Sequence, residues 1–381
     1  MVKIALVAAA LPPQLNGIGD YTANLARELA KSHQVSILTA TNTPFDPILG
    51  LEIHPIFRIG DAKSFRAIDA WTRREKPDWI VLQYQCFSYG KWGFNLELPR
   101  AMARVARHAK NESGTRFALM MHEPFVRATT PKNAVMSLWQ RWQLWSLGQN
   151  ARANFFSIEA WQNEFSPWFP RRANVHLPVM SNIPALFAAR DAARRELGLE
   201  NRDFVLGIFG TAHDSRLLER ALDAARAVSE AGWQPVVLYI GPHGAAMRAA
   251  LPGLQILAPG ALPAPEISRH FAAMDIYLAT FVDGVSTRRG SLMAALQHGV
   301  PVVGTAGNLT DTLWHRENGR SIALAPVADA QRFAALVADL VSNPEKRQKM
   351  GSAGRALYER EFSVEVTARH LMETLDSIAQ I

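Results

Sequence analysis

The chain has 381 residues, of which 48% are hydrophobic and 20% charged, a composition typical of a compact globular protein rather than of a disordered or membrane-spanning one. Because this length exceeds the roughly 250–300 residues at which a single core stops growing, two domains are expected. The formal net charge of +7 suits an anionic partner, which could be a small ligand, a phospholipid surface or a nucleic acid. The arginines are scattered and no nucleic-acid-binding motif is found, so nucleic-acid binding is not expected.

Cys86 is the only cysteine, which excludes a disulfide or a cysteine-based metal site within one chain. The run from Met1 to Ala10 resembles a signal peptide, but it is better explained as a strand that leads to the loop at Gly17. We therefore expect a cytoplasmic protein, and the inner face of the membrane stays open as an alternative.

Short apolar runs alternate with helical periods through both halves of the chain, as in parallel sheets joined by crossover helices. The predicted strands of the first half are Lys3–Ala9, Gln34–Thr39, Trp79–Gln83, Arg116–Met121 and Asn154–Ser157. Those of the second half are Phe204–Phe209, Pro235–Ile240, Gln255–Leu257, Ile276–Ala279 and Val300–Gly304. Two doubly wound, Rossmann-like α/β domains are predicted.

The predicted domain boundary lies in the segment Pro178–Pro184, which holds two prolines and no helical period. We predict a first domain over residues 1–182 and a second over 183–362. The last helical run, 363–381, follows the complete second sheet and is predicted to pack back on the first domain.

The first glycine loop follows the first strand and holds Gly17 and Gly19, with Asp20 and Tyr21 opening a helix. Two glycines before a helix let backbone amides approach an anion, although a plain strand-to-helix turn is an alternative. A G-x-G-x-x-G fingerprint directly after the strand is absent, and so is a G-x-x-x-x-G-K-[ST] phosphate loop.

Ligands of doubly wound domains bind beyond the carboxyl ends of the strands. The segment Tyr84–Asn95, rich in aromatic residues and glycine, follows one predicted strand, and His122 and Glu123 follow the next. His122 could be a general base, a hydrogen-bond partner of a substrate hydroxyl, or a surface histidine.

A tryptophan stripe, Trp139, Trp142 and Trp145, lies on the predicted helix from Ala134 to Ala151, together with Arg141. Such a stripe could lie on a membrane surface. Core packing is the commoner explanation, since the same spacing marks a buried helical face.

The second domain has two polar loops that each join a strand to a helix. One holds Gly210, Thr211 and Arg216, and the other runs from Asp283 to Ser291. Small residues and amides at the start of a helix, with arginines beside them, could hold a diphosphate as negative charge grows on it. The alternative is that these arginines form a solvated face.

The sequence resembles the large retaining glycosyltransferase family numbered four, whose members have the GT-B fold. The resemblance covers nearly the whole chain and rests on Gly17–Tyr21, His122–Glu123, Ser181–Pro184 and Gly299–Val303. It implies two Rossmann-like domains with a cleft between them, an N-terminal acceptor-side domain and a C-terminal nucleotide-sugar donor domain. It also implies no cofactor and no metal, and the chain has no Asp-x-Asp motif.

The sequence departs from this family at several positions. Thr211 stands where the family has an arginine that clamps the diphosphate, and Arg216 stands where it has a lysine. The family's Glu-x7-Glu motif would fall at Ser286 and Ala294, so both glutamates are missing. Because one glutamate normally approaches the donor sugar and the other the ribose, the identity of the donor cannot be carried over from the family.

The resulting prediction is a metal-independent glycosyltransferase of polysaccharide biosynthesis, which moves a sugar from a nucleotide diphosphate-sugar to a hydroxyl acceptor with retention. The acceptor is a glycan, a lipid-linked molecule or a small molecule, and peripheral membrane contact stays open. The alternatives are a sugar-nucleotide epimerase on the same fold and a non-catalytic sugar-nucleotide-binding protein.

Three groups of site residues are predicted. The catalytic residues are His122 and Asp283. The residues predicted to bind the donor diphosphate are Gly17, Gly19, Gly210, Thr211, Arg216, Ser286, Thr287, Arg288, Arg289, Gly290 and Ser291. The residues predicted to bind the acceptor are Asp20, Tyr21, Tyr84, Asn95 and Glu123.

Overall fold

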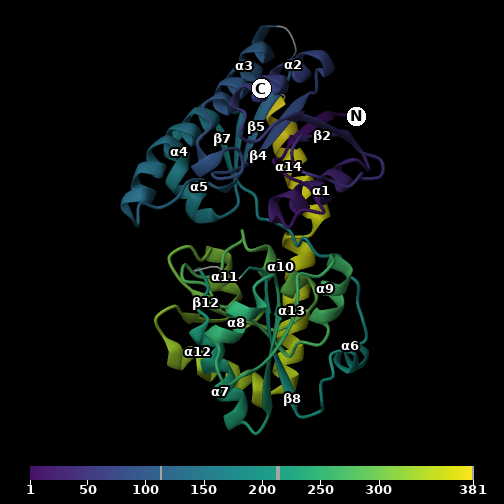
Figure 1. Cartoon of the computed structure of the whole chain (residues 1–381), viewed down its shortest axis with the longest axis vertical. Helices are drawn as coiled ribbons and strands as arrows, with labels where there is room; N and C mark the ends of the chain where they lie inside the picture. The colour runs from purple at the N-terminus through teal and green to yellow at the C-terminus, as the bar shows by residue number, and fades with distance from the viewer. Residues whose placement is uncertain (112–113, 212–214, 380–381) are drawn as a thin grey trace. The chain divides into compact units, whose positions relative to one another are not determined.

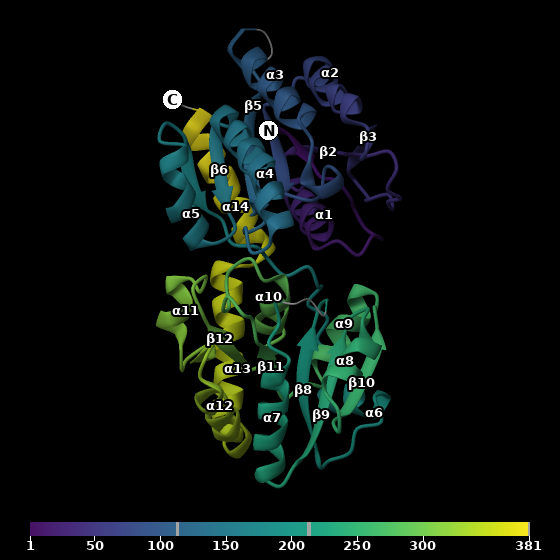
Figure 2. The ribbon, with the colours of Figure 1, turned by 60° about the vertical axis from the view of Figure 1, so that its left-hand side comes forward.

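A computed structural model describes residues 1–111, 114–211 and 215–379, with side chains omitted for 108–111. The chain divides into two compact units: unit 1 is Met1–Pro178 with Val364–Ile381, and unit 2 is Val179–Ser363. Unit 2 begins inside the proline-containing segment at which the sequence predicts a boundary. The final helix belongs to unit 1, where Figures 1 and 2 show it in yellow beside the first helix of the chain.

Unit 1 contains a sheet of seven parallel strands in the order β3-β2-β1-β4-β5-β6-β7. The strands are β1 Lys3–Val7, β2 Gln34–Ala40, β3 Glu52–Phe57, β4 Trp79–Gln85, β5 Arg116–Glu123, β6 Ala153–Phe156 and β7 Ala173–His176. The chain builds one half of the sheet outward from β1 and then the other half outward from β4. This is the order of a doubly wound sheet, with its switch point between β1 and β4.

The helices of unit 1 cross between these strands. They are α1 Gly17–Leu29, α2 Arg66–Glu75, α3 Glu97–Asn111, α4 Pro131–Asn150, α5 Glu159–Phe165 and α14 Val364–Ala379. Short 3-10 turns lie at η1 Ala62–Phe65, η2 Lys91–Gly93 and η3 Ser166–Trp168. Because α14 packs on α1 and on β6, this helix is part of the packed interior of unit 1.

Unit 2 contains six parallel strands in the order β10-β9-β8-β11-β12-β13. The strands are β8 Asp203–Phe209, β9 Gln234–Ile240, β10 Gln255–Gly260, β11 Ile276–Ala279, β12 Val302–Ala306 and β13 Ala323–Pro326. The helices are α6 Arg190–Glu196, α7 Glu219–Glu230, α8 Gly244–Ala250, α9 Ala264–Phe271, α10 Gly290–Gln297, α11 Thr312–Glu317, α12 Ala330–Ser342 and α13 Pro344–Glu361. The switch point lies between β8 and β11, which Figure 2 shows near the middle of this sheet.

The central strands are buried on both faces, which is why they read as continuous apolar runs. All seven residues of β8 lie in the interior or at its margin, and they pack with residues of α7 and α12 in one core. The predicted strands in these central positions are therefore confirmed, with ends that move by one or two residues.

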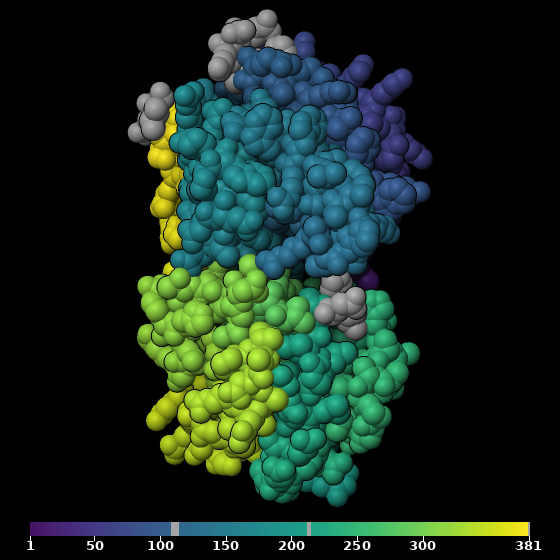
Figure 3. Space-filling model, turned by 90° about the vertical axis from the view of Figure 1, so that its left-hand side faces the viewer, coloured from purple at the N-terminus to yellow at the C-terminus, as the bar shows by residue number. Residues whose placement is uncertain are grey.

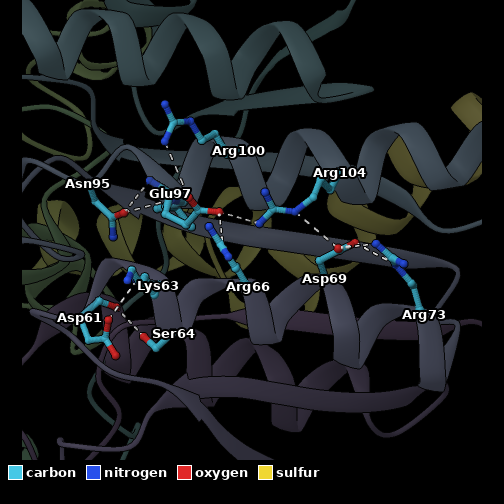
Figure 4. A network of polar contacts seen from close by, with 11 residues as sticks. Asp61, Lys63, Ser64, Arg66, Asp69, Arg73, Asn95, Glu97, Arg100 and Arg104 are labelled. Carbon is cyan, nitrogen blue, oxygen red and sulfur yellow. Dashed lines mark hydrogen bonds and ion pairs between the residues drawn. The ribbon is translucent and has the colours of Figure 1, made fainter.

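A polar network joins α2 to α3 in unit 1, as Figure 4 shows. Arg104 donates to Glu97 Oε1 at 2.8 Å and lies 3.5 Å from Asp69 Oδ2, so one guanidinium bridges the two helices. Although burial raises the pKa of Glu97, the hydrogen bonds and charges of Arg104 and Arg66 outweigh it and lower this pKa below its usual value. Arg100 and Arg104 of α3 thus have structural partners.

One alternative for α4 is wrong. The helix does not bury the tryptophan stripe: the side chains of Trp142 and Trp145 are 41% and 48% exposed. The buried face instead carries Met136, Gln140, Gln143, Leu144 and Leu147. The spacing of the tryptophans is helical, but it marks the outer face of this helix.

Candidate functional site

The loops after β8 and β11 lie at the carboxyl edge of the second sheet, on the two sides of its switch point. In doubly wound sheets this is where ligands bind, because the chain leaves the two strands in opposite directions and opens a crevice. The two polar loops predicted from the sequence, Gly210–Arg216 and Asp283–Ser291, follow these two strands. Residues 212–214 of the first loop lie outside the described part of the chain.

Asp283 is held between two arginines. Its Oδ1 accepts a hydrogen bond from Arg289 Nη2 at 2.6 Å, and its Oδ2 accepts one from Arg288 Nη2. The three side chains are only 15–17% exposed. Since both carboxylate oxygens are engaged, Asp283 is arranged as a counterion that orients the two guanidinium groups.

Arg216 joins this pair through Phe281. The backbones of Arg216 and Phe281 form an isolated antiparallel bridge between the two loops. The guanidinium carbons of Arg216 and Arg289 lie 5.0 and 4.1 Å from the centre of the Phe281 ring. A cation near an aromatic ring is stabilised by the ring's quadrupole, so Phe281 positions both arginines.

Arg216 also fastens the end of β8. Its Nη2 donates to Phe209 O and its Nε donates to Thr211 O at 3.3 Å. The Thr211 side chain is exposed, and its predicted contact with the diphosphate stays a prediction.

The cluster of Arg216, Arg288, Arg289 and Asp283 carries a formal charge of +2, three cations against one anion. Burial and, to a smaller degree, the charge of Arg288 lower the pKa of Arg289 to about 10, so this side chain stays protonated near neutral pH. Such a concentration of buried positive charge would suit an anion with two or more negative charges.

Three buried polar atoms at this site have no hydrogen-bond partner among the described residues. They are Nη1 of Arg216, Nε of Arg289 and Oγ of Ser286. A buried polar group that is left unpaired costs free energy. Because these atoms are buried, a ligand would reach them only after the surrounding side chains move.

The helix that follows, α10, begins at Gly290 without a side-chain cap. Its first carbonyl is that of Arg289, which accepts from Leu292 N and Met293 N. Gly290 and Ser291 are partly buried at this helix start, where the dipole favours negative charge. Thr287 has a different role, because its side chain is fully buried and its amide donates to Asp311 Oδ2 at 2.7 Å.

Gly284 makes the turn that brings Asp283 toward the arginines. Its φ of 85° is in the left-handed region that favours glycine. A Cβ at this position would also overlap Thr310 Oγ1 and the backbone nitrogen of Gly307. The Asp-Gly pair noted in the sequence therefore has a geometric reason.

In unit 1, His122 lies at the end of β5 and contacts Gln83 and Tyr21. Its Nε2 is 2.8 Å from Gln83 Oε1, and its ring packs edge-on against Tyr21 with 4.9 Å between ring centres. Burial lowers the pKa of His122 to about 3. The ring is therefore neutral at physiological pH and suits a hydrogen-bonding role better than that of an imidazolium acid.

The glycine loop of unit 1 is capped by its own chain. Asn16 Oδ1 accepts hydrogen bonds from the amides of Ile18 and Gly19, both at 3.0 Å. A Cβ at Gly19 would come within 2.7 Å of Ala10 O, so this glycine allows close packing against the preceding loop. These contacts give Gly19 a structural role, and the predicted phosphate contacts of Gly17 and Gly19 stay predictions.

The predicted acceptor residues do not form one group. Tyr84 lies inside β4, which is two residues longer than predicted, and is 2% exposed. Asn95 is also buried, and its Oδ1 accepts from the amides of Glu97 and Leu98 at the start of α3. Packing and helix capping therefore occupy Tyr84 and Asn95, which argues against an acceptor-binding role for either side chain.

The other acceptor candidates stay predictions. Glu123 Oε2 accepts from Gln85 Nε2 at 2.8 Å, which ties the ends of β4 and β5 together. Burial raises the pKa of Asp20 to about 6, an effect that the charge of Arg27 partly offsets. Tyr21 packs against the predicted catalytic histidine, His122.

Sequence reasoning missed three residues that position others. Phe281 positions Arg216 and Arg289, Gln83 positions His122, and Asp311 accepts a hydrogen bond from the amide of Thr287. An aromatic residue between a strand and an Asp-Gly turn was a signal for Phe281, but such residues are usually core. Within the described residues no group of three or more His, Cys, Asp or Glu side chains could hold a metal ion. The described helices also include none that is long and apolar enough to cross a membrane.

Comparisons with known proteins agree with this picture. Residues 203–343 match the model of the family described as glycosyl transferases group 1. This region contains the strands β8 to β13 and the whole arginine cluster. No curated protein matches the sequence.

Solved structures are similar over nearly the whole chain. Sucrose-phosphate synthase from Thermosynechococcus elongatus has 15% identity and a TM-score of 0.74, with 99% of each chain covered. HepE from Anabaena in complex with UDP-glucose has 16% identity and a TM-score of 0.68, covering 99% of this chain and all of that one (100%). WaaG, a glycosyltransferase involved in lipopolysaccharide biosynthesis, has 12% identity and a TM-score of 0.68, covering 98% and 99%. The GT-B fold predicted from the sequence is confirmed.

Proposed function

We propose that the protein is a nucleotide-sugar-dependent glycosyltransferase whose donor diphosphate is bound by Arg216, Arg288 and Arg289. The observation that carries this proposal is the buried cluster of net charge +2 at the switch point of unit 2. Two further facts support it: this unit matches a glycosyltransferase family model, and HepE, a structure of the same fold, was solved with UDP-glucose.

The arginines would act on the leaving group. When the bond between the sugar carbon and the diphosphate oxygen breaks, negative charge grows on the diphosphate. Guanidinium groups that are already oriented stabilise this charge without reorganising, and removing one such group typically costs about 10²–10³ in rate. Asp283 would keep Arg288 and Arg289 in place, as a positioning residue rather than as a base.

In unit 1 we assign His122 to the sugar, as a neutral hydrogen-bond partner of one of its hydroxyl groups. Gln83 Oε1 fixes the orientation of the His122 ring by its hydrogen bond with Nε2 of that ring, and the low pKa of His122 keeps the ring uncharged. The acceptor is a hydroxyl compound, and Asp20, Tyr21 and Glu123 are the residues proposed to bind it. Retention of configuration and independence of metal ions follow the resemblance to family four and are part of the proposal.

The first test is a calorimetric screen of nucleoside diphosphates and their sugars against the wild type, Arg288→Ala and Arg289→Ala. Each substitution removes a charge-assisted contact, so we expect a loss of roughly 10- to 100-fold in diphosphate affinity. Arg226→Ala is the control, since Arg226 is an exposed arginine of α7 in the same unit. If neither Arg288→Ala nor Arg289→Ala weakens binding, the assignment of the donor site is wrong.

The second test follows products with the donor that binds. Transfer to an acceptor with an unchanged anomeric configuration, observed by NMR and insensitive to EDTA, is the expected result. An isomerised donor formed without any acceptor would show the epimerase instead. Donor binding without turnover across a broad acceptor panel would identify a sugar-nucleotide-binding protein.

A further inference from the structure

The helix α4 has two glutamines among the apolar residues of its inner face and exposed apolar residues on its outer face. Gln140 and Gln143 are 0% and 3% exposed, whereas Leu138 is 70% exposed and Val135 55% exposed. Trp142 and Trp145 continue the same outer face one and two turns further along. Exposed apolar residues that gather in one stripe, unlike single ones, mark a binding surface.

The buried glutamines explain why the helix is oriented in this way. Gln140 Nε2 donates to Trp92 O at 3.1 Å and its Oε1 accepts from Val126 N at 2.8 Å. Gln143 Nε2 donates to Gly93 O at 2.7 Å and its Oε1 accepts from Asn95 N at 2.5 Å. Because these bonds satisfy the inner face, the outer apolar residues are not needed to hold α4 on the sheet.

The loop around η2 extends this apolar stripe. Trp92 and Phe94 are 56% and 50% exposed, and Trp92 adopts a φ of 57°, in the region that non-glycine residues avoid. Trp139 Nε1 donates to Trp92 O at 3.1 Å, and the ring of Trp139 packs edge-on against Phe94. A non-glycine residue held in this conformation is a sign of function, and here it directs an indole outward.

Basic side chains accompany the aromatic ones. The ammonium groups of Lys91 and Lys132 lie 5.3 and 5.9 Å from the centre of the Trp92 ring. Arg141 donates to Ser137 Oγ at 3.0 Å and lies over the Phe125 ring. The segment 124–158, which contains all of α4, has four basic residues and no Asp or Glu.

An open hollow of about 540 Å³ lies at the end of this stripe. It is lined by Arg141, Trp142, Trp145, Pro167 and Trp168. One cation among three indoles is the chemistry of a site for an anionic headgroup with an apolar tail. The space-filling view of Figure 3 looks toward this side of unit 1, where blue and teal atoms of α4 and α5 lie at the surface.

We propose that this α4 surface, formed by α4 and the η2 loop, docks unit 1 on a bilayer that contains anionic phospholipid. Tryptophan prefers the membrane interface, and exposed leucine, valine and phenylalanine gain by entering the acyl boundary. Lys91, Lys132 and Arg141 would pair with headgroup phosphates. A second copy of the chain is a poorer occupant, because a two-fold contact would bring these cations against each other without any carboxylate from α4.

The test is co-sedimentation of the whole protein with vesicles of phosphatidylcholine alone and of phosphatidylcholine with phosphatidylglycerol. We expect binding to the anionic vesicles only, falling as salt rises. Trp142→Ala with Trp145→Ala should weaken it by at least about tenfold. Lys132→Gln with Arg141→Gln should weaken it by roughly thirtyfold, since each basic residue near an anionic surface contributes about a fivefold factor.

Matched controls lie in unit 2. Trp233 is 41% exposed, as Trp142 is, so Trp233→Ala tests whether any exposed tryptophan has the same effect. Arg226→Gln with Arg248→Gln removes two exposed charges in the same way. Both controls should bind anionic vesicles like the wild type, and thermal unfolding should show that all variants are folded.

Three outcomes would overturn the proposal. One is equal binding to neutral and anionic vesicles, and another is unchanged binding of both α4 double variants. The third is a dimer in analytical ultracentrifugation that Trp142→Ala with Trp145→Ala converts to a monomer, which would make this surface a contact between copies. None of these measurements depends on glycosyl transfer, so the proposal can fail while the proposed function stands.

Discussion

Replacing Asp283 by Asn separates its role as a counterion from a direct role in catalysis. In the structure both carboxylate oxygens of Asp283 pair with Arg288 and Arg289. The substitution keeps the size of the side chain and removes one negative charge. The formal charge of the cluster therefore rises from +2 to +3.

The expected effect on ligand binding follows from Coulomb's law. A diphosphate bound on the far side of the arginines lies roughly 6–8 Å from the Asp283 carboxylate. At an effective dielectric constant of about 20–40, the repulsion between the Asp283 carboxylate and each charge of the diphosphate is about 1–3 kcal/mol. Because a diphosphate carries at least two negative charges, removing this repulsion should tighten its binding by at least about 30-fold.

The expected effect on the free protein has the opposite sign. Without Asp283, two mostly buried guanidinium groups face each other without a counterion, which should lower the free energy of unfolding by about 1–3 kcal/mol. A bound diphosphate restores the missing negative charge. The ligand should therefore raise the melting temperature of Asp283→Asn by more than it raises that of the wild type.

Calorimetry and thermal unfolding with the best-binding nucleoside diphosphate measure both effects. Asp223→Asn is a matched control, because Asp223 pairs with Arg220 at 2.9 Å in the same unit and these side chains are 20% and 11% exposed. It should lose stability without gaining affinity. Weaker diphosphate binding by Asp283→Asn would refute this electrostatic reasoning and show that the bonds by which Asp283 orients Arg288 and Arg289 outweigh the removed repulsion.

Two further predictions concern Gly284 and His122. Gly284→Ala should lower the free energy of unfolding by about 3 kcal/mol or more, because it adds left-handed strain and an overlap with Thr310. The control is Gly319→Ala, which should cost only about 1–2 kcal/mol, because Gly319 has a similar φ of 82° but open space around it. Equal losses of the two variants in denaturant titrations would contradict this prediction. The pKa of His122 falls from 6.5 to about 3 on folding, so only the unfolded chain takes up a proton at this ring as pH drops below about 6.5. Proton uptake by the unfolded chain lowers the stability of the wild type. His122→Gln should therefore lose less stability than the wild type between pH 7 and pH 5. Parallel losses in the two proteins would show that the ring is protonated in the folded state.

The sequence predicts the centre of each sheet better than its edges. The three strands that it misses, β3, β7 and β13, all lie at sheet edges. An edge strand has a neighbouring strand on one side only and is less buried, so it needs no continuous apolar run. Accordingly, β7 is half-buried throughout, and β3 contains Pro55, a residue that is tolerated in edge strands. The fold class does not depend on these strands, which is why it could be predicted without them.

The candidate site was predictable in its location but not in its contacts. The rule that ligands bind beyond the carboxyl ends of strands places the arginines and His122 correctly at those ends. It cannot tell which side chain at such an end is already occupied. The side chain of Asn95 already accepts a hydrogen bond from the amide of Glu97, at the start of α3. The amide of Gly19 already donates to the side chain of Asn16. These contacts depend on side-chain directions that a linear pattern does not contain.

The arginine cluster accompanies a serine and an alanine at the two positions where the resemblance to family four would place glutamates. Ser286 and Ala294, which stand at the two glutamate positions, are both fully buried, so a glutamate at either place would put an unpaired charge in the interior of unit 2. The carboxylate of this site is instead Asp283, where two arginines neutralise it. A site of this kind attracts phosphates strongly and offers few acceptors to sugar hydroxyls. A nucleoside diphosphate should therefore bind about as tightly as its sugar conjugate, and a conjugate that binds far more tightly would mean that a carboxylate other than Asp283 recognises the sugar.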